Sequence, residues 1–353
     1  MGDGAALAGL DIRAFDHWLA HRSPELRGDA PVTADLLTGG LSNLTYRIDG
    51  GARPLVLRRP PLGHVLSTAH DMGREYRVLS ALQGTRVPVP RTRLFEASED
   101  PATGVDAPFY LMDHVDGDIL DAPADNARYT PAELRTLSLA LAEVLAELHS
   151  LDPAQIGLDD FGRPDGFIER QLRRWATQYE GNRFRELPEL DALLERLGER
   201  LPETRHTSIV HGDYRLDNVL VARTATGPRI AAVLDWEMAT LGDSLTDVGL
   251  LALYWDIAEI ADETGAVVSA VDPAAGYPGF DELADAYAAA RGIRMPELGW
   301  YRAFAALKLA IILEGIQLRH DQGETVGAGF DHVGAMVAPL ARAGTRFLEE
   351  VRS

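Results

Sequence analysis

Two acidic segments in the second half of the chain contain the residue types that phosphoryl transfer to a hydroxyl needs. Residues 211–218 read HGDYRLDN, and residues 233–237 read VLDWE. One carboxylate can accept the proton of an attacking hydroxyl, while an amide oxygen and a second carboxylate can hold magnesium against the phosphates of ATP. Apolar, β-prone runs adjoin both segments and predict two short strands. Four polar side chains would then lie close together near the ends of these strands: Asp213, Asn218, Asp235 and Glu237.

The same residue types also occur in ordinary turns. Asp and Asn hydrogen-bond their own backbone and tolerate left-handed conformations, so a plain hairpin could use them as turn formers. Here His-Gly-Asp, an Asn and a later apolar-Asp-Trp-Glu occur in order and at matched spacing, which favours a catalytic site. Because the chain has no cysteine, a thiolate metal site is excluded and the candidate ligands are oxygen atoms.

Together these segments resemble the catalytic and metal-binding segments of the aminoglycoside phosphotransferase and choline kinase superfamily, whose fold is that of the protein kinases. The resemblance implies that Asp213 is the catalytic base and that Asn218 and Asp235 bind magnesium. It makes Glu237 a further candidate for metal contact. It assigns His211 to bracing the loop rather than to chemistry.

The resemblance extends to the residues that would support the loop and to the fold. Residues 242–247 read GDSLTD and match a family motif whose last aspartate, here Asp247, supports the catalytic loop through hydrogen bonds. The implied fold is α+β and bilobal. Its N-terminal lobe is an antiparallel sheet with one helix, and its larger C-terminal lobe is mainly helical.

The boundary between the lobes is expected where an apolar strand, APFYLM at 107–112, runs into DHVDG. We therefore expect a nucleotide-binding lobe at 1–113 and a catalytic and acceptor-binding lobe at 114–353. Main-chain groups near Asp113 and Val115 would be free to bond an adenine edge. Beyond this point, TPAE at 130–133 predicts the start of a long helix through a capping box with proline at its first position.

Two features of the first lobe are candidates for phosphate binding. Glycines between two extended stretches allow backbone amides to approach an anion, although a hairpin turn explains them equally well without the later catalytic loop. The candidates in this loop are Gly39, Gly40, Ser42 and Asn43. The next strand has Arg58 where most kinase-like folds have a lysine that holds phosphate, and its planar fork would bind phosphate differently. Glu75, on the following helix, could face Arg58 or could be a solvated surface residue.

The acceptor is the least determined part of the prediction. Three arginines, Arg170, Arg173 and Arg174, could line an acceptor cleft and suit an anionic group, or could be the solvated face of an amphipathic helix. The sequence LVLRRPPLG at 55–63 and this helix look like the branch related to the kinase-like domain of certain acyl-CoA dehydrogenases, where arginine at the third-strand position is usual. That resemblance implies a hydroxylated acyl chain, free or as its CoA thioester.

Two other functions remain open from the sequence. An aminoglycoside carries several ammonium groups and would require an acidic cleft. Four residues are candidates for lining it: Asp256, Glu259, Asp262 and Glu263. A nucleotide-binding pseudokinase is motivated by Arg58 and opposed by the intact base and metal positions. Two further charged residues, Lys308 and Glu314, are expected to be surface or packing charges.

The composition agrees with an enzyme that acts on a small molecule. The net charge is -20 over 353 residues, which argues against binding to nucleic-acid phosphates. No secretory signal and no run of about 18 apolar residues is visible, so we expect no membrane association. The expectation is a cytoplasmic phosphotransferase that uses ATP and Mg²⁺.

Overall fold

The computed structural model describes residues 7–37, 43–62, 71–261, 269–323 and 333–350. The chain forms two compact units, one of Met1–Asp116 with Ala231–Glu237 and the other of Gly117–Ile230 with Met238–Ser353. The predicted lobes, 1–113 and 114–353, are consecutive in the chain. In the structure the chain returns to the first unit for a short segment, which carries Asp235 and Glu237.

A five-stranded antiparallel sheet is the centre of the first unit, with the strand order β1-β2-β3-β5-β4. Its strands are β1 (Thr33–Leu36), β2 (Leu44–Asp49), β3 (Leu55–Arg59), β4 (Thr92–Glu96) and β5 (Phe109–Asp113). Helix α3 (Met72–Leu82) packs on β4 and β5, while α1 (Ile12–Arg22) and α2 (Pro24–Arg27) precede the sheet. Leu55 and Leu57 of β3 share a hydrophobic cluster with Phe15 and Leu19 of α1, so α1 covers one face of the sheet.

The second unit is mainly helical. Its helices are α4 (Pro131–Ser150), α5 (Phe167–Asn182), α6 (Pro188–Glu199), α7 (Leu245–Trp255), α8 (Ile257–Ala261), α9 (Phe280–Arg291), α10 (Gly299–Asp321) and α11 (Val337–Glu350). Four strands form two small sheets: β6 (Thr207–Val210) with β9 (Thr240–Asp243), and β7 (Val219–Thr224) with β8 (Gly227–Val233). Short 3-10 helices occupy 101–103, 123–128, 153–156, 216–218, 236–238, 273–275 and 333–336.

Helix α4 begins as its sequence predicts. The Thr130 hydroxyl accepts the Glu133 N–H at 3.3 Å, and the Glu133 carboxylate accepts the Thr130 N–H at 2.8 Å. This reciprocal capping box satisfies N–H groups that have no partner inside the helix. The predicted helix start is therefore confirmed.

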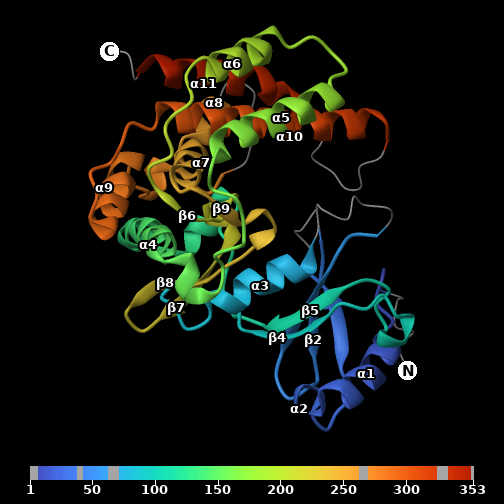
Figure 1. Ribbon diagram of the computed structural model, residues 1–353. Helices are drawn as coiled ribbons and strands as arrows, with labels where there is room; N and C mark the ends of the chain where they lie inside the picture. The colour runs from blue at the N-terminus through green and yellow to red at the C-terminus, as the bar shows by residue number, and fades with distance from the viewer. Residues whose placement is uncertain (1–6, 38–42, 63–70, 262–268, 324–332, 351–353) are drawn as a thin grey trace. The chain divides into compact units, whose positions relative to one another are not determined.

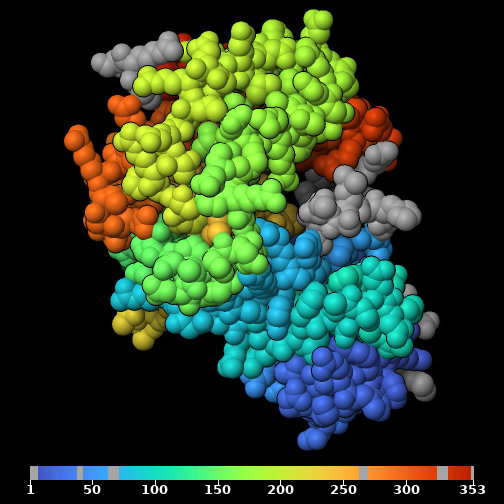
Figure 2. All heavy atoms as spheres, in the orientation of Figure 1, coloured from blue at the N-terminus to red at the C-terminus, as the bar shows by residue number. Residues whose placement is uncertain are grey.

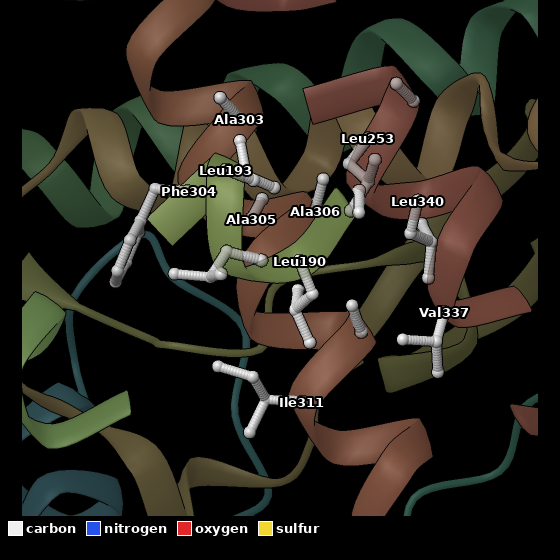
Figure 3. Close-up of a cluster of buried hydrophobic side chains, with 14 of the residues drawn as sticks. Leu190, Leu193, Leu253, Ala303, Phe304, Ala305, Ala306, Ile311, Val337 and Leu340 are labelled. Atoms are coloured by element: carbon white, nitrogen blue, oxygen red, sulfur yellow. The ribbon is translucent and has the colours of Figure 1, made fainter. Parts of the chain in front are cut away.

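Helix α10 lies at the centre of the second unit's core and packs against α5, α6, α7 and α11 (Figure 1). Figure 3 shows the buried side chains that gather around it: Leu190 and Leu193 of α6, Leu253 of α7, and Val337 and Leu340 of α11. On the face shown in Figure 2, α5 and α6, green to yellow-green, form much of this unit's visible surface, whereas α10 is visible only in part. Two charged residues of α10, Lys308 and Glu314, are buried in this unit.

None of the helices in the described part of the chain has both the length and the apolarity needed to cross a membrane.

Candidate active site

The segment with the His-Gly-Asp motif follows β6 and leads through a 3-10 helix at Leu216–Asn218 into β7. Gly212 has φ 85°, and a Cβ there would lie 2.8 Å from the Cβ of Met238 and 2.9 Å from its carbonyl oxygen. Both the left-handed conformation and the close approach require glycine. The loop can therefore turn sharply just before Asp213.

Asp247, in the first turn of α7, holds the two residues before Asp213 in place. Its carboxylate accepts the N–H of His211 at 2.7 Å and the N–H of Gly212 at 2.8 Å. The carboxyl group is fully buried, and it also accepts a hydrogen bond from Nε2 of His149 at 3.2 Å. Although burial favours the neutral form, His149 and the backbone donors keep the pKa of Asp247 below its usual value.

Asp213 and Asn218 form a direct pair. The Nδ2 group of Asn218 donates to the main-chain oxygen of Asp213 and to its Oδ2, each at 2.8 Å. Both acceptors fix the orientation of the amide, and the Asn218 Oδ1 atom accepts no hydrogen bond from the residues that the structure describes. The Asp213 N–H is 3.2 Å from Nδ1 of His211, which braces the turn from within.

Arg215 is a neighbour of Asp213 that the sequence interpretation did not select. Its Nε is 3.5 Å from Oδ2 of Asp213, and its Nη1 is 2.8 Å from the carboxylate of Asp217. The guanidinium lies over the ring of Tyr254, 4.8 Å from the ring centroid. Its position two residues after the candidate base was a signal that could have identified it.

A second group of candidate residues lies within the first unit. Arg58 Nε donates to Glu75 Oε2 at 3.0 Å, and Arg58 Nη2 donates to Asp235 Oδ1 at 2.5 Å. The predicted pairing of Arg58 with Glu75 is therefore present, whereas the alternative of a solvated glutamate is wrong because Glu75 is 2% exposed. Arg58 Nη1 has no acceptor among the described residues.

Burial raises the pKa of Glu75, although Arg58, the hydroxyl of Tyr110 and the N–H of Trp236 all favour its charged form. Tyr110 lies opposite Arg58 in the pairing of β3 with β5. Asp235 has φ 62°, the one positive value at a non-glycine residue in the described chain. Such a conformation is costly and is often found where a side chain must be aimed at a functional site.

Glu237 and Asn43 contact each other within this unit. Asn43 Nδ2 donates to Glu237 Oε2 at 2.9 Å, and the buried Oδ1 of Asn43 has no hydrogen-bond donor in the described structure. The other predicted members of the glycine loop, Gly39, Gly40 and Ser42, lie outside the described residues.

Part of the segment predicted to bind an adenine edge already forms hydrogen bonds within its own unit. The Asp113 N–H donates to the Arg91 carbonyl at 2.8 Å, and the Asp113 carboxylate is held by Arg93 at 2.7 and 2.5 Å. The Asp113 N–H is therefore not available. Val115 forms no main-chain hydrogen bond with the rest of the described chain, so its groups remain candidates.

The four residues proposed for the acceptor have different surroundings. Arg170 donates to the carbonyl groups of residues 163 and 165 at the start of α5, and Arg173 forms an exposed ion pair with Glu169 at 2.6 Å. Asp256 pairs with Arg302 at 2.8 Å. These contacts tie three of the candidates to their own neighbourhoods. Arg174 alone among the three arginines has no ion pair or hydrogen bond within the described residues.

The candidate residues thus form two groups, each inside one compact unit. Asp213, Asn218, His211 and Asp247 belong to the second unit, and the group around Arg58 and Asp235 belongs to the first. The expected proximity of Asp213 to Asp235 remains a prediction.

Comparison with known proteins assigns the chain to a family. Residues 33–304 match the phosphotransferase enzyme family. The rat (Rattus norvegicus) acyl-CoA dehydrogenase family member 11 is 33% identical over 342 residues, which cover 95% of this chain and 43% of that protein. The chain thus spans less than half the length of this relative.

Solved structures agree with that assignment. A putative aminoglycoside phosphotransferase from Ralstonia eutropha superposes with a TM-score of 0.80 at 31% identity, covering 97% of this chain and 99% of the other. Aminoglycoside 2'-phosphotransferase-IIIa, solved as its GDP complex, has a TM-score of 0.62 at 17% identity over 95% of this chain and 99% of its own, and supports the fold. The chain therefore belongs to the phosphotransferase enzyme family and has a protein-kinase-like fold.

Proposed function

We propose that this protein transfers the γ-phosphoryl group of ATP, with Mg²⁺, to a hydroxyl group of a hydroxyacyl chain, free or as its CoA thioester. The observation that carries the proposal is the pairing of Asp213 with Asn218 on a loop held by Asp247. Asp213 would orient the acceptor hydroxyl and accept its proton. Since Asn218 bonds both the main-chain oxygen and the carboxylate of Asp213, little reorganisation would be needed when the acceptor binds.

The residues present fit a magnesium site. The Oδ1 atom of Asn218, which accepts no hydrogen bond within the described residues, and the carboxylate of Asp235 are the hard oxygen donors that this ion prefers, and Glu237 is a further candidate. When bound, magnesium would neutralise charge on the phosphate oxygens.

The nucleotide would be held mainly by the first unit. Arg58 keeps Nη1 available for a phosphate oxygen, while its other two nitrogens are fixed by Glu75 and Asp235. The main-chain groups of Val115 would meet the adenine edge.

A cationic surrounding of Asp213 supports an anionic acceptor over an aminoglycoside. Arg215 lies beside Asp213, and both Arg174 and Arg215 are close enough to Lys308 to lower its pKa. Aminoglycosides carry several ammonium groups, which this positive charge would repel. Of the four acidic residues that could compensate, Asp256 is paired with Arg302, and Asp262 and Glu263 lie outside the described residues. The similarity to acyl-CoA dehydrogenase family member 11 points to the same acceptor class.

The proposal is tested by mass spectrometry of phosphate transfer from Mg-ATP to hydroxyacyl-CoAs, free hydroxy acids, aminoglycosides and choline. Asp213→Asn should lower turnover by about 10²- to 10⁴-fold, the range for a lost general base. Asp285→Asn, an exposed position on α9, is the matched control and should leave turnover unchanged.

Each outcome separates the candidate functions. A phosphorylated acyl species that disappears in Asp213→Asn supports the proposal. A phosphorylated aminoglycoside would refute the hydroxyacyl acceptor and indicate a drug-modifying enzyme instead. Binding of ATP without transfer to any acceptor or to water would favour a pseudokinase, and full activity of Asp213→Asn would refute the assignment of the base.

A further inference from the structure

Lys308, on the central helix α10, is a buried cation beside the candidate catalytic loop. It is 7% exposed, and its Nζ donates to the carbonyl oxygen of Gly212 at 2.5 Å. The sequence suggested a surface or packing charge, and the surface alternative is wrong. The residue stands almost a hundred positions after the loop that it contacts, so no local pattern indicates the contact.

The surroundings of this ammonium do not explain it as an ordinary ion pair. No carboxylate of the described residues lies within 4.0 Å of Nζ, and its other contacts are the Met238 sulfur at 3.6 Å and the face of the Trp175 ring at 5.7 Å. Burial lowers the pKa of Lys308, while Asp213 and Asp247 raise it through space. Burying a cation with so little compensation costs stability, and a methionine or leucine would pack here without that cost.

The bond to Gly212 acts on the peptide group that leads into Asp213. The carbonyl of this peptide is held by Lys308, and its N–H, which belongs to Asp213, is 3.2 Å from His211 Nδ1. The preceding N–H groups are held by Asp247 on α7. Rotation of the Gly212–Asp213 peptide would break bonds at both of its ends, so the direction of the Asp213 side chain is set from α7 and α10 together.

We propose that Lys308 is a positioning residue for phosphoryl transfer, which locks the Gly212–Asp213 peptide and so aims the Asp213 carboxylate at the acceptor hydroxyl. The inference rests on the proposed role of Asp213 but not on the identity of the acceptor. A misplacement of about 1 Å can lower the rate by two orders of magnitude. The buried ammonium therefore lowers the stability of the fold but raises the turnover number, because it holds Asp213 in position.

The first test replaces Lys308 by methionine, which retains the volume and removes the charge. The turnover number should fall by about 10- to 100-fold, the effect of one charge-assisted hydrogen bond, with the KM for ATP unchanged. Ile311→Val on the same helix is the matched control: it perturbs the packing of α10 without touching the loop, and it should keep wild-type turnover.

The second test separates positioning from general stability. Lys308→Ala leaves a hole beside Gly212, and ethylamine or propylamine should restore part of the turnover with saturation, while ethanol or propanol of the same size should not. Unchanged turnover in Lys308→Met overturns the inference. So does a loss that the amines fail to restore, or one that Ile311→Val reproduces at an equal decrease in melting temperature.

The same variants remain informative if the proposed acceptor is wrong. Slow hydrolysis of ATP without acceptor also needs an aimed base, with water in place of the hydroxyl. A wild-type protein that phosphorylates no hydroxyacyl species refutes the acceptor class. The inference about Lys308 would still be decided, because the hydrolysis rates of the variants, with and without amine, give the same comparison.

Discussion

Asp247→Asn replaces a buried carboxylate by an amide of the same shape, and its cost can be worked out from three contacts. Oδ1 of Asp247 accepts the Gly212 N–H, whereas Oδ2 accepts both the His211 N–H and the Nε2–H of His149. All three partners are donors, and asparagine has only one acceptor oxygen. With its NH2 group at the Oδ2 position, the amide faces two donors, the His211 N–H and His149 Nε2. With the NH2 group at the Oδ1 position, it faces one donor, the Gly212 N–H.

The cheaper orientation places the NH2 group at the Oδ1 position. The Gly212 N–H then loses its acceptor inside the protein, at about 1–3 kcal/mol. The other two bonds change from charge-assisted to neutral, which removes about 1 kcal/mol each. Relief from burying a charge offsets part of this sum. We expect Asp247→Asn to lower the free energy of unfolding by about 3 kcal/mol, together with turnover, since the loop before Asp213 loses an anchor.

The assay is urea unfolding followed by tryptophan fluorescence, with turnover measured on the same preparations. Asp243→Asn is the control, because this aspartate is equally buried but has different partners: the Leu245 N–H and the hydroxyl groups of Tyr301 and Thr204. Hydroxyl groups can rotate to accept from an amide, so that the partners stay satisfied and the cost should be below about 1 kcal/mol. Equal stability of Asp247→Asn and the wild type would refute the reasoning, as would an equal loss in the two variants.

Two further predictions concern the buried charges. Arg58→Met should lower the free energy of unfolding by about 3–5 kcal/mol, because it leaves Glu75 buried without its cation; adding Glu75→Gln should recover part of the loss, and no recovery in urea unfolding would contradict this. Burial lowers the pKa of His149 below 6.5, whereas the pKa of Asp247 lies below 3.8 because His149 and the backbone donors outweigh the effect of burial. The unfolded chain therefore binds more protons at both groups, and stability falls as pH drops below about 6.5, first through His149. Unfolding midpoints measured between pH 8 and 5 should show this fall, and His149→Gln should flatten it; an unchanged slope in that variant would argue against His149 as the source.

Much of the local structure was predictable because it depends on neighbours in the sequence. The capping box at Thr130 and the strands β7 and β8 after Asn218 follow from residues within a few positions of one another. The pairing of Arg58 with Glu75 was also predictable, because the periodicities of a strand and of the helix that follows it restrict the directions in which their side chains can point. The family resemblance seen in the motifs of the loop was confirmed by the family match over 33–304.

The predictions about the arginines of α5 show where sequence spacing was insufficient. Arg170, Arg173 and Arg174 all lie off the apolar face of the helix, so periodicity treats them alike. In the structure, Arg170 donates to a carbonyl group of the turn before the helix, and Arg173 pairs with Glu169 one turn away. Arg174 has no ion pair or hydrogen bond within the described residues. A long side chain selects its partner from the atoms around it, and those atoms come from the folded surroundings.

The sequence by itself indicated the chemistry proposed for this protein: a candidate base, an amide and two further carboxylates in the motifs at 211–218 and 233–237. Only the tertiary structure decided which distant residues hold that loop. Lys308 and His149 lie far from Asp213 in the chain, on helices whose apolar patterns identify them as core, and they reach the loop only because α4, α7 and α10 pack around it. The reason is physical: hydrophobic spacing determines which face of a helix is buried, but the partner of a buried polar group is determined by the packing of the other elements.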